Sequence, residues 1–238
     1  MKERIINSCN LGLKTSRYNL KIIFANKFIY LLLAAVGFFL IEAVISLLSD
    51  TNPTEGSVYY FLLVPGLLLI FYPTTFGIQN DLDSRMLEMI FGIPDYRFKV
   101  YLVRMALIYV FVYIMLLLLS VVSSFALVSI PVFEMVYQLM FPIFCIGCIA
   151  FFFSTLVRNG YGTAVIMIVI GIAFWISAGI LQNSPWNIFL NPLVIPRDMN
   201  EVIWADVVTK NRIYLAVGTF IFLIWGLLLL QKREKFLG

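Results

Sequence analysis

Histidine is absent from the 238-residue sequence, and charged residues make up only 13% of it. The missing histidines remove the commonest metal ligand and the commonest general base. Soluble domains are about a quarter charged, whereas this chain is 62% apolar with a mean hydropathy of +0.97. Glycine and proline together make up only about a tenth of the residues, which excludes collagen and disordered chains. The composition therefore predicts a protein that lives in lipid.

Catalytic and redox motifs are also scarce. Two of the three cysteines, Cys145 and Cys148, stand at i and i+3 inside an apolar run. This spacing occurs in redox pairs, but no soluble redox domain surrounds it, so we interpret both as small buried core residues. A disulfide framework is not expected. Because the apolar runs hold one carboxylate, no histidine and no phosphate-binding P-loop, we expect no intrinsic enzyme activity and no metal or cofactor bound by this chain.

Long apolar runs dominate the rest of the sequence. A helix needs about 20 residues to cross a hydrocarbon core about 30 Å thick. Six runs meet this length, and together they predict an all-α polytopic membrane protein with one transmembrane domain spanning residues 1–238. The predicted spans are Phe28–Leu48, Val58–Ile78, Val103–Ser129, Met135–Val157, Tyr161–Leu181 and Ile213–Leu230.

Lysine and arginine alternate between the connectors of these spans. One face of the membrane collects 14 of them and the other face three. The positive-inside rule places the richer face in the cytoplasm, with both termini. The net charge of +4 comes from short connectors rather than one continuous face, so we expect no nucleic-acid binding.

The N-terminal region 1–27 is basic and contains a predicted amphipathic helix over Gly12–Lys27. Lys14, Arg17 and Lys21 share one helical face, and apolar side chains lie on the next. Such a helix can lie flat on an anionic inner leaflet as an elbow before the first span. The alternative is a basic anchor that only sets orientation. The C-terminal tail 231–238 is also expected in the cytoplasm.

Two connectors carry more apolar residues than a solvated loop needs. In Asp81–Arg97, apolar residues recur at helical spacing, which predicts a short cytoplasmic helix over 81–93 with Asp81 and Asp83 at its start and Pro94 at its end. Asp81 can pair with Arg85 there. The apolar edge of this helix either packs under the protein or docks into a soluble partner. The outer loop 182–212 mixes tryptophans with prolines, so we expect short interfacial or re-entrant helices there.

Polar residues inside the spans are few. Glu42 lies about 9 Å from the outer end of the first span. It can serve a substrate path or proton step, bond another helix, or snorkel outward. Pro65 and Pro73 predict a kinked second span whose freed carbonyls need partners.

The connector then shows a resemblance to a known family. The run from Asp81 to Arg97 resembles the cytoplasmic signature of ABC type-2 transporter permeases, which is roughly Glu-x-Glu-x-Gly-Thr-Leu-Glu, an apolar stretch, Pro, and Arg three residues later. The segment 153–159 is similar to the basic segment after that family's fourth span. Leu87, Glu88, Pro94 and Arg97 match the signature, Asp81 and Asp83 replace glutamates, and Arg85 and Met86 stand where Gly-Thr is usual.

This resemblance implies a permease subunit of a bacterial exporter in the cytoplasmic membrane. Two permease chains, identical or related, would form the path, and each would rest a coupling helix on a separate ATPase subunit that binds ATP and magnesium. Leu87, Met86 and Ile90 would enter a groove of that ATPase, and Glu88 and Arg85 would fix the helix. A six-span vitamin-binding module and a non-transporting scaffold are the competing interpretations.

We place the substrate path between two such chains, along the first, second and fifth spans. The mostly apolar faces suit an amphipathic or hydrophobic cargo, such as a peptide, antimicrobial, lipid-like or drug-like molecule. The alternative is that the same residues only pack the bundle. The predicted path residues are Glu42, Tyr72, Thr74, Thr75, Gly171, Trp175 and Ala178.

Overall fold

The computed structural model describes residues 28–48, 53–83 and 96–230, and every regular element in these ranges is an α-helix. Six of these helices are long and apolar enough to cross a membrane, which confirms a multi-pass membrane architecture. They are α2 (Phe28–Leu48), α3 (Glu55–Asp83), α5 (Tyr96–Ala126), α6 (Val132–Val157), α7 (Gly160–Ile180) and α8 (Glu201–Leu230).

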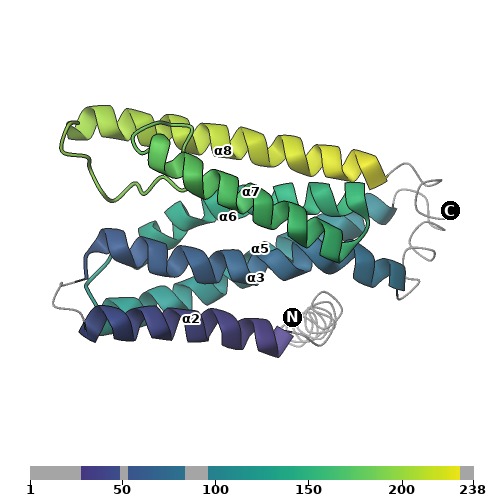
Figure 1. Cartoon of the computed structure of the whole chain (residues 1–238), viewed down its shortest axis with the longest axis horizontal. Helices are drawn as coiled ribbons and strands as arrows, with labels where there is room; N and C mark the ends of the chain where they lie inside the picture. The colour runs from purple at the N-terminus through teal and green to yellow at the C-terminus, as the bar shows by residue number, and fades with distance from the viewer. Residues whose placement is uncertain (1–27, 49–52, 84–95, 231–238) are drawn as a thin grey trace, which may run out of the picture.

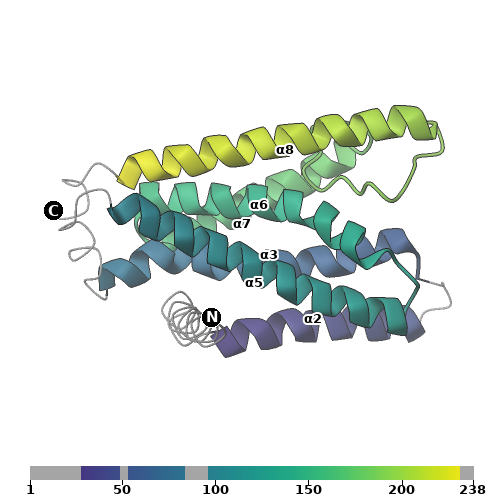
Figure 2. The ribbon, with the colours of Figure 1, turned by 180° about the vertical axis from the view of Figure 1, so that it is seen from behind.

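The helices form one bundle in which successive helices run in opposite directions (Figures 1 and 2). α2 lies at one edge and α8 at the opposite edge, with α6 between α3 and α8. One end of the bundle, called here the Asp81 end, carries the end of α3, the start of α5 and the turn between α6 and α7. The other end, called the Asn191 end, carries the connection from α5 to α6 and the loop 181–200 between α7 and α8.

α6 is the centre of the core because it is apolar on all sides and packs most extensively against α8 and α3. Two glycines allow its close approach to α3. A Cβ atom built at Gly66 of α3 would overlap Ile143 of α6, and one built at Gly147 of α6 would overlap Ile70 of α3. Small residues of this kind let membrane helices pack tightly. By contrast, α7 is mostly exposed and presents an apolar surface to its surroundings.

The two prolines predicted to kink the second span both lie inside α3. Side-chain hydroxyls bond to carbonyls near Pro73. Thr74 Oγ1 donates to the carbonyl of Ile70 at 2.7 Å, and Ser154 Oγ of α6 donates to the carbonyl of Thr75 at 2.9 Å. Side-chain hydroxyls thus supply additional hydrogen bonds to carbonyls beside Pro73. The kink itself and partners for the carbonyls that the two prolines free stay predictions.

The helix predicted to begin at Asp81 does not begin there. Asp81 and Asp83 form the last turn of α3, which continues five residues beyond the predicted span end at Ile78. The prediction of a helix N-terminus at these aspartates was wrong, because Asp81 belongs to a buried ion pair that keeps the end of α3 helical against α5. The rest of the predicted coupling helix, the predicted helix Gly12–Lys27 and the tail 231–238 lie outside the described residues.

The last span also begins earlier than predicted. α8 starts at Glu201, twelve residues before Ile213, because Asn200 Oδ1 accepts a hydrogen bond from the Ile203 amide at 2.8 Å and so caps the helix. An ion pair of Asp206 with Lys210, one turn apart, lies on this polar first part of α8. The loop 181–200 contains turns rather than the predicted short helices.

The expected membrane orientation can be tested by single-cysteine labelling in a cysteine-free background. The exposed residue Asp198 lies in the loop at the Asn191 end, and the exposed residue Tyr161 lies at the start of α7 near the Asp81 end. The charge asymmetry predicts that Asp198→Cys reacts with an impermeant maleimide in intact cells, whereas Tyr161→Cys reacts only after permeabilisation. The reverse pattern would contradict the orientation.

Candidate functional site

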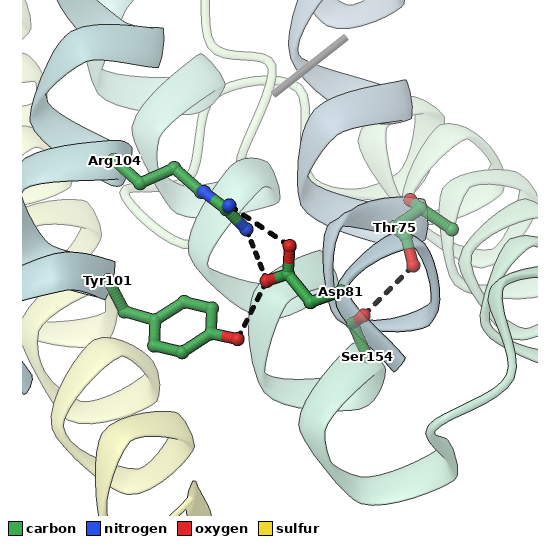
Figure 3. Close-up of polar contacts among 5 residues, drawn as sticks. All are labelled: Thr75, Asp81, Tyr101, Arg104 and Ser154. Atoms are coloured by element: carbon green, nitrogen blue, oxygen red, sulfur yellow. Dashed lines mark hydrogen bonds and ion pairs between the residues drawn. The ribbon is translucent and has the colours of Figure 1, made fainter. Parts of the chain in front are cut away.

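A buried ion pair joins the last turn of α3 to the third turn of α5. The guanidinium of Arg104 donates two hydrogen bonds to the Asp81 carboxylate, from Nη1 to Oδ2 at 2.5 Å and from Nη2 to Oδ1 at 3.0 Å. The hydroxyl of Tyr101 donates a third to Oδ2 at 2.8 Å. Because Tyr101 and Arg104 are three residues apart on α5, both side chains point at the same carboxylate (Figure 3). We call these three residues the Asp81 clamp.

Burial makes the clamp energetically important. The Asp81 side chain is 3% exposed and that of Arg104 is 10% exposed. The guanidinium also lies 5.4 Å from the centre of the Tyr101 ring, within reach of a cation–π interaction. The two hydrogen bonds from Arg104 and the third from Tyr101 compensate for the water that both charges lose on burial. Removing one partner would leave the other charged and buried.

The same end of α3 is also tied to α6 and α7. The carbonyl of Thr75 accepts a hydrogen bond from Ser154 of α6 (Figure 3). One turn later, the side-chain carbonyl of Gln79 accepts a hydrogen bond from the amide of Gly160, the first residue of α7. The last three turns of α3 are therefore joined by polar contacts to α5, α6 and α7.

The Asp81 clamp joins the two helices that flank the segment with the family resemblance. Residues 84–95 lie between the end of α3 and the start of α5, and the clamp fixes these two helices to each other. The two helices that flank the segment are therefore held together at this end of the bundle.

The other residues predicted to couple to an ATPase fall in three groups. Asp83 is exposed at the end of α3, and Arg97 lies in the first turn of α5, where only the backbone is described. The remaining six lie outside the described residues: Arg85, Met86, Leu87, Glu88, Ile90 and Pro94.

The structure brings together only part of the predicted substrate path. Trp175 and Ala178 of α7 line a cavity of about 610 Å³ at the Asn191 end. Gly171 lies deeper on α7 and faces open space. Thr74 and Thr75 are buried, and Tyr72 stacks on Phe76 inside the chain.

Glu42 lies on α2, at the edge of the bundle opposite α8 (Figures 1 and 2). Its side chain is half-buried and has no hydrogen bond or ion pair with the part of the chain that the structure describes. An interhelical hydrogen bond within these ranges is therefore not its role. A path role between two chains stays a prediction for all seven residues.

A second polar network lies at the Asn191 end. The buried guanidinium of Arg212 donates to Gln138 Oε1 at 2.8 Å, to Asn211 Oδ1 at 2.9 Å and to the carbonyl of Leu190 at 3.3 Å. Asn211 Nδ2 in turn donates to the carbonyls of Pro185 and Asn187, at 2.9 and 2.8 Å. These contacts fasten the loop 181–200 to α6 and α8.

The sequence patterns do not single out Tyr101, Arg104 or Arg212, because the positive-inside rule treats both arginines only as orientation signals. A usable signal is present for Arg104, because an arginine within an apolar run, one turn after a tyrosine, needs a buried acid partner, and the aspartates Asp81 and Asp83 follow the preceding span.

Cysteine and metal chemistry do not define a site in the described residues. Cys145 and Cys148 are buried free thiols, and Cys148 Sγ lies 3.0 Å from the hydroxyl of Tyr109. Within residues 28–48, 53–83 and 96–230, no three acidic or sulfur side chains gather to hold a metal ion. The six membrane-length apolar helices fit a multi-pass helical membrane protein. Comparison with protein-family models, curated proteins and solved structures finds no match to this chain.

Proposed function

We propose that this chain is the permease subunit of an ABC type-2 exporter, driven by a separate ATPase subunit that binds ATP and magnesium. The observation that carries the proposal is the Asp81 clamp, which joins the two helices flanking the segment with the family signature. The six membrane-length helices and the match of Leu87, Glu88 and Pro94 to the signature also support it.

The clamp suggests how ATP binding could act on the bundle. Closure of the ATPase dimer would move the segment 84–95, and the clamp would transmit this movement to α3 and α5. Ser154 and Gly160 would pass it on to α6 and α7 through their hydrogen bonds with α3. For the ATPase to shift the permease between two conformations, its contacts with the segment must differ in free energy between them.

In this proposal, two permease chains form the path in a bacterial cytoplasmic membrane, with both termini in the cytoplasm. The cargo is an amphipathic or hydrophobic molecule, because the spans offer few polar groups to a charged solute. ATP hydrolysis belongs to the partner, and the chain itself contributes movement and binding rather than catalysis.

The first test is co-purification of a P-loop ATPase with the chain from its native membrane. In the reconstituted complex, Glu88→Lys is expected to abolish the dependence of ATP turnover on the permease, because the reversed charge would repel the partner surface. Glu134→Lys, a charge reversal at an exposed residue of the Asn191 end, is the matched control and should leave turnover unchanged.

Two results would contradict the proposal. A vitamin-binding module would bind its ligand tightly as an isolated chain and would be indifferent to Glu88. A scaffold would leave the ATP turnover of any partner unchanged on removal of the permease.

A further inference from the structure

A cavity between α3, α7 and the loop 181–200 is built from two different kinds of surface. Its volume is about 610 Å³, within the range of sites for drug-sized ligands. The part between the helices is apolar, with Leu63, Val64 and Leu67 of α3 facing Ala178 and Gly179 of α7. The part under the loop 181–200 is lined by amide side chains.

The amides are held in place by the loop itself. Asn187 and Asn191 are both 7% exposed, and their side-chain oxygens accept hydrogen bonds from the amides of Phe189 and Leu193. Asn191 Nδ2 donates to the carbonyl of Gly56. The Nδ2 group of Asn187 has no acceptor in the described part of the chain, so it can donate to a molecule in the cavity.

Aromatic residues complete the wall and the rim. The Trp204 side chain is 5% exposed, and its indole nitrogen donates to the carbonyl of Pro192, so the ring is fixed against the loop. Trp175, 72% exposed, and Tyr60, 45% exposed, also line the cavity. No lysine, arginine, aspartate or glutamate is among the described residues that line the cavity.

The cavity is polar at the loop and apolar between the helices, and this difference would set the orientation of a bound ligand. The apolar walls descend along α3 for about two turns from Tyr60 to Leu67, or about 10 Å. The amides lie at the loop. An uncharged head group would find donors and acceptors there, whereas a charged one would lose water without gaining a counter-ion in the lining.

We propose that this cavity binds a neutral single-chain amphipath, with its hydrogen-bonding head under the loop 181–200 and its apolar chain between α3 and α7. The assignment depends on the cavity alone and holds whether or not the chain has an ATPase partner. It goes beyond the proposed transport function by assigning a site and a head-group chemistry.

Trp204 provides a reporter for the test. In a variant with Trp175→Phe, Trp186→Phe and Trp225→Phe, Trp204 is the remaining tryptophan, and it is buried against the loop. A second variant keeps only Trp225, which is 53% exposed on α8 and reports probe dissolved in the bilayer. The probe is a monoacylglycerol with a dibrominated chain, added to each variant in lipid nanodiscs.

We expect saturable quenching of Trp204, with half-quenching at a probe concentration at least about tenfold below that for Trp225. Quenching of Trp204 that rises linearly and in parallel with Trp225 would overturn the site. The brominated fatty acid anion and an alkylammonium with the same chain should bind at least about tenfold more weakly, and equal binding would overturn the neutral head group.

A pair of glycine variants tests the location. A Cβ atom at Gly179 or at Gly218 meets no neighbour within 4 Å, so both positions accept a larger side chain, but only Gly179 lines the cavity. Gly179→Phe should raise the half-quenching concentration at least about tenfold, and Gly218→Phe should leave it unchanged. Ala178→Phe repeats the test at a second lining residue. Unchanged binding in both lining variants would overturn the site without affecting the proposed coupling to an ATPase.

Discussion

Replacing Asp81 with asparagine is expected to destabilise the folded protein by about 3–5 kcal/mol, because it leaves the Arg104 guanidinium buried without a counter-charge. The substitution keeps the size of the side chain, so the loss comes from charge and not from a cavity. It should appear as a lower midpoint of thermal unfolding in detergent micelles, followed by tryptophan fluorescence.

Asp83 supplies the matched control for this result. It is the same residue type two positions away, but its side chain is exposed. Asp83→Asn should change stability by less than about 0.5 kcal/mol, as expected for an exposed residue without buried contacts. The double variant Asp81→Leu with Arg104→Met should regain most of the stability, because an apolar pair removes both buried charges. Equal midpoints for Asp81→Asn and Asp83→Asn would contradict the buried ion pair.

The second large effect is expected at Asn211. This side chain is 1% exposed and makes three hydrogen bonds, to the carbonyls of Pro185 and Asn187 and to the guanidinium of Arg212. Asn211→Leu keeps a similar volume but leaves these groups without their partner. Since each unsatisfied buried group costs about 1–3 kcal/mol, a total loss of about 2–4 kcal/mol is expected.

Limited proteolysis can locate this loss in the loop. Arg197 is an exposed trypsin site in the loop 181–200, so weakening the contacts of Asn211 should speed cleavage there. Asn200 is the control, because it is exposed and only caps α8, so Asn200→Leu should cost about 1 kcal/mol. If trypsin cuts Asn211→Leu and Asn200→Leu at Arg197 as slowly as it cuts the unmodified protein, the contacts of Asn211 do not hold the loop 181–200.

Hydrophobic run length predicted the spans well, because crossing a bilayer demands a long apolar helix whatever the neighbours are. The predicted span Phe28–Leu48 coincides with α2. The start of α8 was missed because Glu201 to Arg212 is polar enough to be read as loop, although Asn200 caps it as helix.

The clamp and the cavity were harder to predict for a different reason. Asp81 meets Arg104 only once α3 and α5 pack side by side, and periodicity within one segment cannot show which residues of two helices face each other. Likewise, Trp175 and Ala178 were selected as unusual residues of one span, but the amides opposite them come from a loop whose path depends on Asn191 and Asn211.

The unequal helix lengths bear on how the protein fits bilayers of different thickness. α2 and α7 have 21 residues each, or about 32 Å, close to the thickness of an average hydrocarbon core. α3 and α8, with 29 and 30 residues, are about 12 Å longer and extend past them, α3 towards the Asp81 end and α8 towards the Asn191 end. The two shorter helices are also among the least buried. We therefore expect α2 and α7 to tilt first when the bilayer becomes thinner. Hydrophobic mismatch would thus be absorbed at the edges of the bundle, while the glycine-mediated contact of α3 with α6 keeps its geometry.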